Sequence, residues 1–495
     1  MRSHVGARRG LIFAAAIALL PAAVWASIFR PGLALAILAA APVVALLVWS
    51  LTWRLEKALI AYLFVHVLAD TLKRLVFVVG VENVLVQYLP LAVKLSLLLA
   101  LGAWGLGRRV AAGRLDGLDR VLLGFVALVV LSLVLSDSFS LEARAAMLPF
   151  SVGPYLIFFA YREAAATPGW RDRFLRTLVG LGLVAAAYGG VQAVVGPSWV
   201  DRAWAEASHT FSIQARNVWM AVTADVPMRP YSFFADHFSY GYFLVAALFG
   251  LWVGGWPRGR AARLAAAAVL LVALATAMTR AAGAAVLLAG LVAAALAVFP
   301  PVRRLFPALA LAAYAVLSLA VTPVYERFFP EQSLDSAWAR QTLSLGSLSA
   351  RRDAGRAFLL AAERYPLLGD PGEGSGSRFV TAKLAPDLEE ERLEREVDDA
   401  HNLLVGMVTI AGLPGCGLFV AFLVLVLRAA GRTAGPPDRA AAAVVGLLLA
   451  GVAGGFTVMA GLFMAWCAFA APPPAPAAAR APRAACVEWA GGTHG

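Results

Sequence analysis

Charged residues and cysteine are both scarce in this sequence. Only 15% of its 495 residues are charged, and its three cysteines are Cys416, Cys467 and Cys486. Neither their number nor their spacing fits a disulfide framework or a metal site. The glycine-rich stretch at residues 366–376 follows no predicted strand, so it is not a dinucleotide-binding fingerprint. The sequence also has no convincing internal repeat.

Long apolar runs, in contrast, fill most of the chain. Hydrophobic residues make up 61% of it, and the mean hydropathy is +0.76. The runs have the length of a membrane-crossing helix, and a sheet with open edges cannot lie in lipid. We therefore expect an all-α fold, a polytopic membrane helical bundle of about 12–14 transmembrane helices with a long extracytoplasmic loop.

The candidate spans are residues 11–29, 32–51, 57–79, 84–106, 120–136, 144–160, 174–195, 231–254, 263–279, 283–300, 304–322, 402–427, 439–455 and 456–471. The third span contains Asp70, Lys73 and Arg74, which leaves open a shorter helix followed by an interfacial segment. The last two spans could also form one tilted helix.

Basic residues dominate the charge, which is +12. In a soluble protein this excess would suggest nucleic acid. Here it lies in alternate short connections, which is the positive-inside pattern and places the N-terminus in the cytoplasm. The connections predicted to be cytoplasmic hold Arg54 and Lys57; Arg108, Arg109 and Arg114; Arg162, Arg171 and Arg173; Arg258 and Arg260; Arg303 and Arg304; and Arg428 and Arg432. The long loops are then extracytoplasmic.

This pattern divides the chain into regions. They are an N-terminal transmembrane bundle (1–196), an extracytoplasmic loop (197–230), transmembrane helices of the second half (231–322), a large extracytoplasmic loop (323–400), C-terminal transmembrane helices (401–471) and a tail expected to be disordered in the cytoplasm (472–495). Tryptophans in the first loop favour an interfacial belt, or alternatively a sugar-stacking platform. The large loop is acidic, and we expect an amphipathic helix over 352–365 that ends at Pro366.

Several arginines stand close to apolar spans on the predicted extracytoplasmic side. Arg229 precedes Pro230 at the expected start of the span 231–254, and a turn at 279–283 places Arg280 outside. Arg351 and Arg352 open the amphipathic helix of the large loop. Each one alone is explained by snorkelling to lipid headgroups. Together on one side of the membrane they favour a site for a phosphate group, which guanidinium binds bidentately.

His401-Asn402 begin the span 402–427 at the same side. On a continuous helix, His401, Gly412 and Gly415 share a face, and the glycines let a second helix approach closely. A lone histidine there is explained by an interfacial hydrogen bond. The pattern His-Asn, nine residues, Gly-x-x-Gly nevertheless resembles the motif of the O-antigen ligase and O-antigen polymerase superfamily of bacterial membrane glycosyltransferases.

The resemblance extends to residues 190–427. Residues 229–234 look like the family's Arg-x-x-Gly-x-Phe segment, with Ser232 at the usual glycine and His237-Phe238 where Pro-Asn is common. Thr279-Arg280 followed by Gly283 is similar to its Ser/Thr-Arg-Gly turn. The segment from Arg352 to Gly369 resembles the family's segment before the catalytic histidine. The tryptophan that is usual in that segment is missing here, and Gly355 occupies about its place.

The resemblance implies a GT-C-like fold in the bacterial cytoplasmic (inner) membrane with an active site facing the periplasm. It implies transfer of a glycan from an undecaprenyl-pyrophosphate carrier to an acceptor hydroxyl, with inversion at the anomeric carbon and without a metal or other cofactor. His401 is then the general base and Asn402 its orienting or capping neighbour. Arg229, Arg280 and Arg352 bind the pyrophosphate, with Arg351 as a possible substitute for Arg352.

The implied partners are the lipid-linked glycan donor, a glycan or lipid A core acceptor and the bilayer, with no nucleic acid. The sequence leaves open an O-antigen ligase, a polymerase or a protein O-glycosyltransferase. A flippase or transporter of an anionic lipid-linked saccharide is the alternative from another class. Transporters favour ionisable residues near mid-membrane, whereas the charges here lie at one rim.

Overall fold

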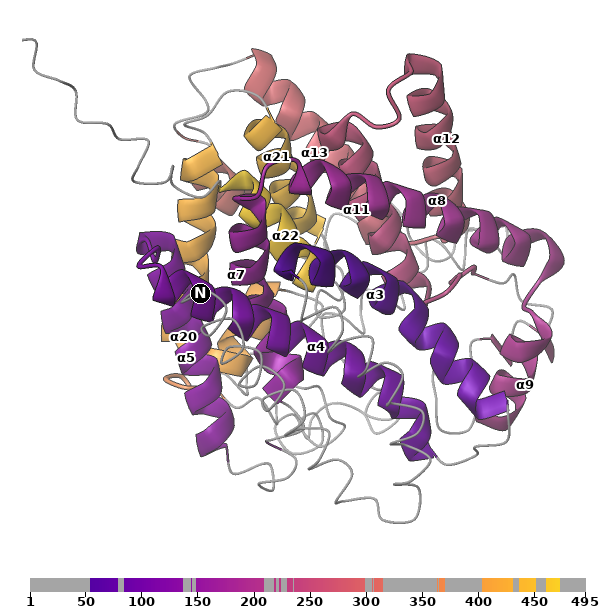
Figure 1. Ribbon diagram of the computed structural model, residues 1–495, viewed down its shortest axis with the longest axis horizontal. Helices are drawn as coiled ribbons and strands as arrows, with labels where there is room; N and C mark the ends of the chain where they lie inside the picture. The colour runs from indigo at the N-terminus through magenta and orange to yellow at the C-terminus, as the bar shows by residue number, and fades with distance from the viewer. Residues whose placement is uncertain are drawn as a thin grey trace, which may run out of the picture.

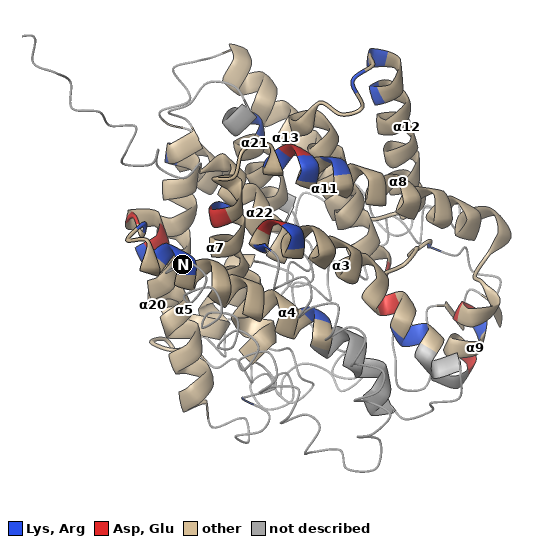
Figure 2. Ribbon diagram, in the orientation of Figure 1, with Lys and Arg blue, Asp and Glu red and all other residues tan. Residues whose placement is uncertain are grey.

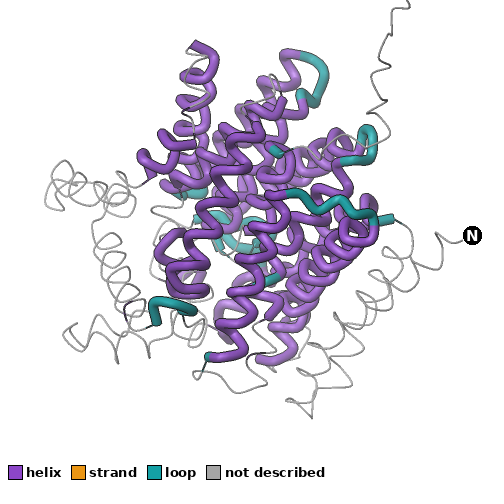
Figure 3. The backbone as a smooth tube through the Cα atoms, turned by 90° about the vertical axis from the view of Figure 1, so that its left-hand side faces the viewer, coloured by secondary structure: helices purple, strands orange, loops and turns teal. Residues whose placement is uncertain are grey.

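The structure is a computed structural model, and it describes residues 54–78, 84–136, 144, 148–208, 218–219, 222–223, 229–234, 236–298, 305, 307–314, 363, 365–369, 403–430, 436–450 and 460–471. Figure 1 shows the helices, which are α3 (Leu55–Val78), α4 (Val84–Ala111), α5 (Gly117–Leu135), α7 (Gly153–Ala165), α8 (Trp170–Val195), α9 (Trp199–Ser208), α11 (His237–Gly254), α12 (Arg260–Thr276), α13 (Arg280–Val298), α20 (Leu403–Ala430), α21 (Pro436–Ala450) and α22 (Ala460–Ala470). These described residues form helices and loops without a strand (Figure 3).

Several of these helices are long and apolar enough to cross a membrane. Five meet both criteria, at Gly117–Leu135, Trp170–Val195, His237–Gly254, Ala281–Val298 and Gly406–Ala430. The prediction of an all-α polytopic membrane protein is therefore confirmed. The number of spans stays a prediction, because the candidate spans 11–29 and 32–51 lie outside the described residues.

The structure decides two alternatives that the sequence left open and confirms one prediction about the helices. Helix α3 runs unbroken through Asp70, Lys73 and Arg74, so the alternative of a shortened helix is wrong. Residues 263–300 divide into α12 and α13, as predicted, around a turn in which Met278 has a φ of 52°. Helices α21 and α22 are separate and pack against each other, so the last two candidate spans are not one tilted helix.

Glycines set the closest helix contacts of the bundle. A Cβ on Gly102 of α4 would lie 2.5 Å from the backbone of Leu156 in α7, and one on Gly105 would lie 2.4 Å from the backbone of Ala160. These pairings run in the same direction along both helices, so α4 and α7 are parallel. Because lipid gives no hydrophobic drive for helix association, such close backbone contact supplies the van der Waals attraction that replaces it.

Helices α8 and α11 pack in the opposite sense. Gly182 of α8 faces Ala247, while Gly250 of α11 faces Val179. The pairing numbers fall on one helix as they rise on the other, so the two helices are antiparallel. The C-terminus of α8 and the N-terminus of α11 consequently meet at the same end of the bundle, which is where Arg229 is found.

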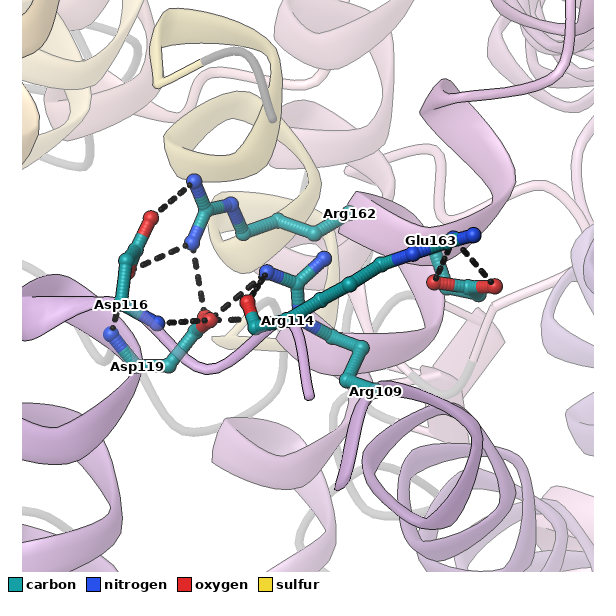
Figure 4. Close-up of polar contacts among 6 residues, drawn as sticks. All are labelled: Arg109, Arg114, Asp116, Asp119, Arg162 and Glu163. Atoms are coloured by element: carbon teal, nitrogen blue, oxygen red, sulfur yellow. Dashed lines mark hydrogen bonds and ion pairs between the residues drawn. The ribbon is translucent and has the colours of Figure 1, made fainter. Parts of the chain in front are cut away.

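A buried ion-pair network joins α4, α5 and α7 at the other end (Figure 4). The Asp119 carboxylate is shared by two guanidinium groups, Arg109 Nη2 at 2.7 Å from Oδ2 and Arg162 Nη1 at 2.7 Å from Oδ1. Arg162 Nη2 also lies 2.9 Å from Asp116 Oδ2. Burial alone would raise the pKa of Asp116, but the hydrogen bond and positive charge of Arg162 outweigh it, so its pKa is lowered.

The network continues outward to less buried partners. Glu163 pairs with Arg108 at 3.5 Å and with Arg114 at 3.4 Å. We call the end that carries this network the basic end, and the opposite end the Arg229 end. Figure 2 shows helices that are uncharged over most of their length, with Lys and Arg at their ends, including the start of α12. The arginines predicted for cytoplasmic loops are thus partly structural, because Arg109 and Arg162 are 1% and 2% exposed.

Removing Arg162 should destabilise the bundle strongly. The Arg162→Met variant leaves the buried Asp119 with only one of its two arginines, which we expect to lower the free energy of unfolding by about 3–5 kcal/mol. The matched change Arg114→Met removes a guanidinium that is 53% exposed and should cost less than about 1 kcal/mol. Thermal unfolding of the detergent-purified variants measures the difference. Equal losses in both variants would contradict the structural role assigned to the network.

Candidate functional site

Residues 229–234 form a tight turn before α11. The amide of Phe234 donates to the carbonyl of Tyr231 at 3.0 Å. The predicted helix start at Arg229-Pro230 is wrong, because α11 begins at His237. The cause is an N-cap at Asp236, whose Oδ1 accepts from the Ser239 amide at 2.7 Å.

Ser232 explains why the resembled family has a glycine at this position. Its φ is 52°, in the left-handed region that favours glycine. The side chain is fully buried, and its Oγ donates to the carbonyl of Ala185 in α8 at 2.8 Å. A hydrogen bond to α8 thus offsets the conformational cost at Ser232.

The structure brings two of the predicted phosphate-binding positions into one neighbourhood. Arg229 Nη1 lies 3.3 Å from His237 Nε2, and the carbonyl of His237 accepts from Thr279 Oγ1 at 3.0 Å. Arg280 follows Thr279 as the first residue of α13. Because His237 contacts both partners, Arg229 and the start of α13 lie close together although about fifty positions separate them in the chain.

A glycine permits this contact between α11 and the α12–α13 turn. A Cβ on Gly241, one turn after His237, would lie 2.8 Å from the Cβ and Oγ1 of Thr279. Asp236, the residue before His237, adds a carboxyl group. Burial raises its pKa, and the negative charge of Asp70 raises it further. The site therefore contains a guanidinium, an imidazole and a carboxyl group that is easier to protonate than usual.

Charged side chains from α3, α4 and α9 surround the segment that carries Arg229. Arg74 Nη1 pairs with Asp201 Oδ1 at 2.5 Å, and Lys94 Nζ lies 3.9 Å from Asp70 Oδ2. All four residues are buried. In the sequence, Asp70 and Arg74 stood out only as interruptions of a span, and Asp201 was not among the predicted site residues. Ionisable residues inside a predicted span are themselves the signal that could have pointed to this cluster.

Helix α20 doubles back at Gly412, which overturns the predicted continuous helix. Gly412 has φ 68° and ψ −176°, a conformation reached essentially only by glycine. The Leu404 carbonyl lies 3.8 Å from Cys416 Sγ, 12 residues away, whereas a straight helix would separate these residues by about 18 Å. The common face that helical spacing predicted for His401, Gly412 and Gly415 therefore does not exist beyond Gly412.

Residues 365–369 of the large loop pack directly onto this reversal. The Leu413 amide donates to the Pro366 carbonyl at 2.8 Å. A Cβ on Gly412 would lie 2.4 Å from the Leu367 carbonyl, and one on Gly369 would lie 2.3 Å from the Thr409 carbonyl oxygen. Gly412 thus allows close approach, as predicted, but its partner is a loop and not a second helix.

Gly415 has a different neighbourhood. A Cβ there would lie 2.3 Å from the Ala411 Cβ across the reversal, and 3.9 Å from the Phe125 ring of α5. The two glycines of the predicted motif therefore serve one local feature: Gly412 makes the reversal and Gly415 leaves room beside it.

The remaining predicted site residues lie outside the described part of the chain. They are His401, Asn402, Arg351 and Arg352, together with the side chain of Arg280. The helix expected at 352–365 also lies largely outside it. Within the described residues, no group of three or more His, Cys, Asp or Glu side chains could hold a metal ion.

The fold and the site define a polytopic helical membrane protein whose arginine-bearing segments converge at one end of the bundle. Residues 265–420 match the family model described as O-antigen ligase. The agreement with this model supports the resemblance to the O-antigen ligase and O-antigen polymerase superfamily. This match includes the positions of Arg280, Arg351, Arg352, His401, Asn402, Gly412 and Gly415, but not Arg229. Neither the comparison with curated proteins nor that with solved structures found a match.

Substituting Gly412 should displace residues 365–369. In Gly412→Ala the new Cβ clashes with Leu367 and the backbone leaves its preferred region, which we expect to cost at least about 2 kcal/mol of stability. Gly417 of the same helix has open space around its Cβ position, so Gly417→Ala is the matched control and should change stability by no more than about 1 kcal/mol. Thermal unfolding and limited proteolysis of the large loop measure both effects. A Gly412→Ala protein as stable and protease-resistant as its control would rule out the docking.

Proposed function

We propose that this membrane glycosyltransferase moves a glycan from an undecaprenyl-pyrophosphate carrier to an acceptor hydroxyl on the periplasmic face of the bacterial inner membrane. The family match supports a membrane glycosyltransferase of the O-antigen ligase or polymerase type. The observation that carries the finer proposal is the contact chain from Arg229 through His237 to Thr279, which brings Arg229 close to the first residue of α13.

The leaving group of this reaction is a pyrophosphate. Its negative charge grows as the glycosidic bond breaks, and guanidinium groups fixed in advance stabilise that charge without reorganising. Arg229 and Arg280 are assigned to the pyrophosphate, with Arg352 as the third arginine and Arg351 as its substitute. The arginines would then do the work that a divalent ion does in other glycosyltransferases, and the enzyme would need no metal.

The acceptor is an alcohol, which attacks well only when a base removes its proton. His401 is assigned as that base because the pKa of an imidazole lies near the working pH. Asn402 would orient the imidazole or cap the helix that follows. Attack from the side opposite the pyrophosphate would invert the configuration at the anomeric carbon.

A purified-protein assay tests the proposal and separates its variants. The protein is incubated with an undecaprenyl-pyrophosphate glycan and with lipid A core, a second lipid-linked glycan or an acceptor protein in turn, with chelator added. Transfer to one acceptor supports the proposal and identifies a ligase, a polymerase or a protein O-glycosyltransferase. Movement of the carrier across vesicles without any transfer product would contradict it and support a flippase.

Variants of the assigned residues give the second test. Arg229→Ala should lower kcat by about 100-fold because one charge-stabilising group is lost. His401→Ala should lower it by at least about 100-fold through loss of the base. Arg202 is exposed at the same end, and its Nε donates to the Pro197 carbonyl, so Arg202→Ala serves as the matched control. Activity close to wild type in correctly inserted Arg229→Ala or His401→Ala would remove that residue from the mechanism.

A further inference from the structure

We propose that Arg74 of α3, held by Asp201 of α9, is a positioning residue that fixes the segment carrying Arg229. This inference deepens the proposed function and rests on it for the role of Arg229. It concerns residues that precede the family-matched region 265–420, so that match does not assign them.

Arg74 binds the segment directly, and each of its three guanidinium nitrogens has a partner. Nη2 donates to the carbonyl of Phe234 at 2.6 Å, while Nη1 pairs with Asp201 at 2.5 Å and Nε donates to the Asp70 carbonyl at 3.3 Å. The guanidinium carbon also lies 4.8 Å from the centre of the Tyr231 ring. The same side chain therefore contacts the segment at two positions and anchors it to α3 and α9.

Asp201 extends the anchorage to α8. Its Oδ2 accepts from Ser198 Oγ at 2.8 Å and from Gln192 Nε2 at 3.3 Å. The other end of the Gln192 amide, Oε1, accepts from the backbone amides of Tyr231 at 3.2 Å and Ser232 at 2.7 Å. The orientation of Gln192 thus depends on Asp201, and the backbone of the segment depends on Gln192.

Further contacts from α3 and α8 hold the same segment. Thr71 Oγ1 donates to the Phe233 carbonyl at 3.0 Å, and the Phe233 ring stacks on the Tyr188 ring of α8 with 4.8 Å between the ring centres. Backbone groups of residues 231–234 are therefore held by side chains of α3 and α8 on both sides. Arg229 lies only two residues before Tyr231, so a shift of this backbone moves the Arg229 side chain relative to the start of α13.

An ordinary structural pair would not need this arrangement. Three separate acceptors and an aromatic ring around one side chain match the planar fork of arginine, which a lysine ammonium cannot reproduce. Arg74 and Asp201 are 3% and 2% exposed, and a buried pair of this kind is weak support for stability by itself. Its strict geometry instead fits a role in setting where the backbone of 231–234 lies.

Hydrogen exchange tests, without reference to activity, whether Arg74 fixes the segment that carries Arg229. In Arg74→Met we expect the amides of peptides covering 229–236 to exchange at least about ten times faster, because Gln192 loses its fixed orientation. Peptides from 241–254 should be unchanged, and Arg202→Met, on α9 at the same end, should alter neither region. Unchanged exchange at 229–236 would overturn the proposal, and so would an equal increase throughout α11.

A double-mutant cycle tests the link to Arg229. Misplacing a catalytic group by about 1 Å can cost about 100-fold in rate, so Arg74→Met should lower kcat by about 10–100-fold. If Arg74 acts through Arg229, adding Arg74→Met to Arg229→Ala should cause no more than about a two-fold further loss. Losses that multiply would show that Arg74 acts independently and would overturn the positioning role.

A milder variant covers the case in which Arg74→Met does not fold. Arg74→Lys keeps the charge but cannot reach all three acceptors, so it should show the same faster exchange at 229–236 and the same non-additivity with Arg229→Ala. Full activity with wild-type exchange in Arg74→Lys would contradict the proposal. If the wild-type protein transfers no glycan at all, the proposed function fails, and the exchange measurements alone decide whether Arg74 fixes the segment.

Discussion

A guanidinium group inside an apolar helical bundle must find all of its partners within the protein, because lipid offers none. This constraint explains the most ordered polar features of the chain. At the basic end, Arg109 and Arg162 share Asp119 and so lock α4, α5 and α7 together. At the Arg229 end, Arg74 finds its partners in Asp201 and in backbone carbonyls, including that of Phe234. The cluster around Asp119 joins helices to one another, whereas the cluster around Arg74 holds the backbone of residues 231–234.

The two kinds of glycine in the chain have correspondingly different effects. Gly102 and Gly105 let helices α4 and α7 touch along their backbones, which supplies packing where the hydrophobic effect cannot. Gly412 breaks a helix and contacts residues 365–369, which tethers the large loop to the reversal inside α20. Arg352, which is proposed to bind the pyrophosphate, lies in this loop, and the proposed base His401 follows it directly, so the tether bears on function as well as on packing.

The sequence was sufficient for the class of fold, because apolar runs of membrane-crossing length permit little else. It also predicted the division of residues 263–300, since a single helix of that length would overshoot the bilayer. The predicted helix bounds were wrong at two places where a single residue interrupts a helix. The Asp236 side chain caps α11 and moves its start to His237, and the left-handed backbone of Gly412 reverses α20. Asp201 was missed because an acidic residue in a loop gives no sign of its buried partner. Arg229 and Arg280 were selected by their place beside apolar spans and by resemblance, and only the fold shows that His237 connects them.

We propose that arginines distant in the sequence converge on one pyrophosphate at the Arg229 end. The most direct measurement is an experimental structure of the protein in lipid with an undecaprenyl-pyrophosphate donor bound. We expect phosphate oxygens within hydrogen-bonding distance of both Arg229 and Arg280, with the sugar directed toward His401. A pyrophosphate bound at the basic end, or one that contacts neither arginine, would contradict it.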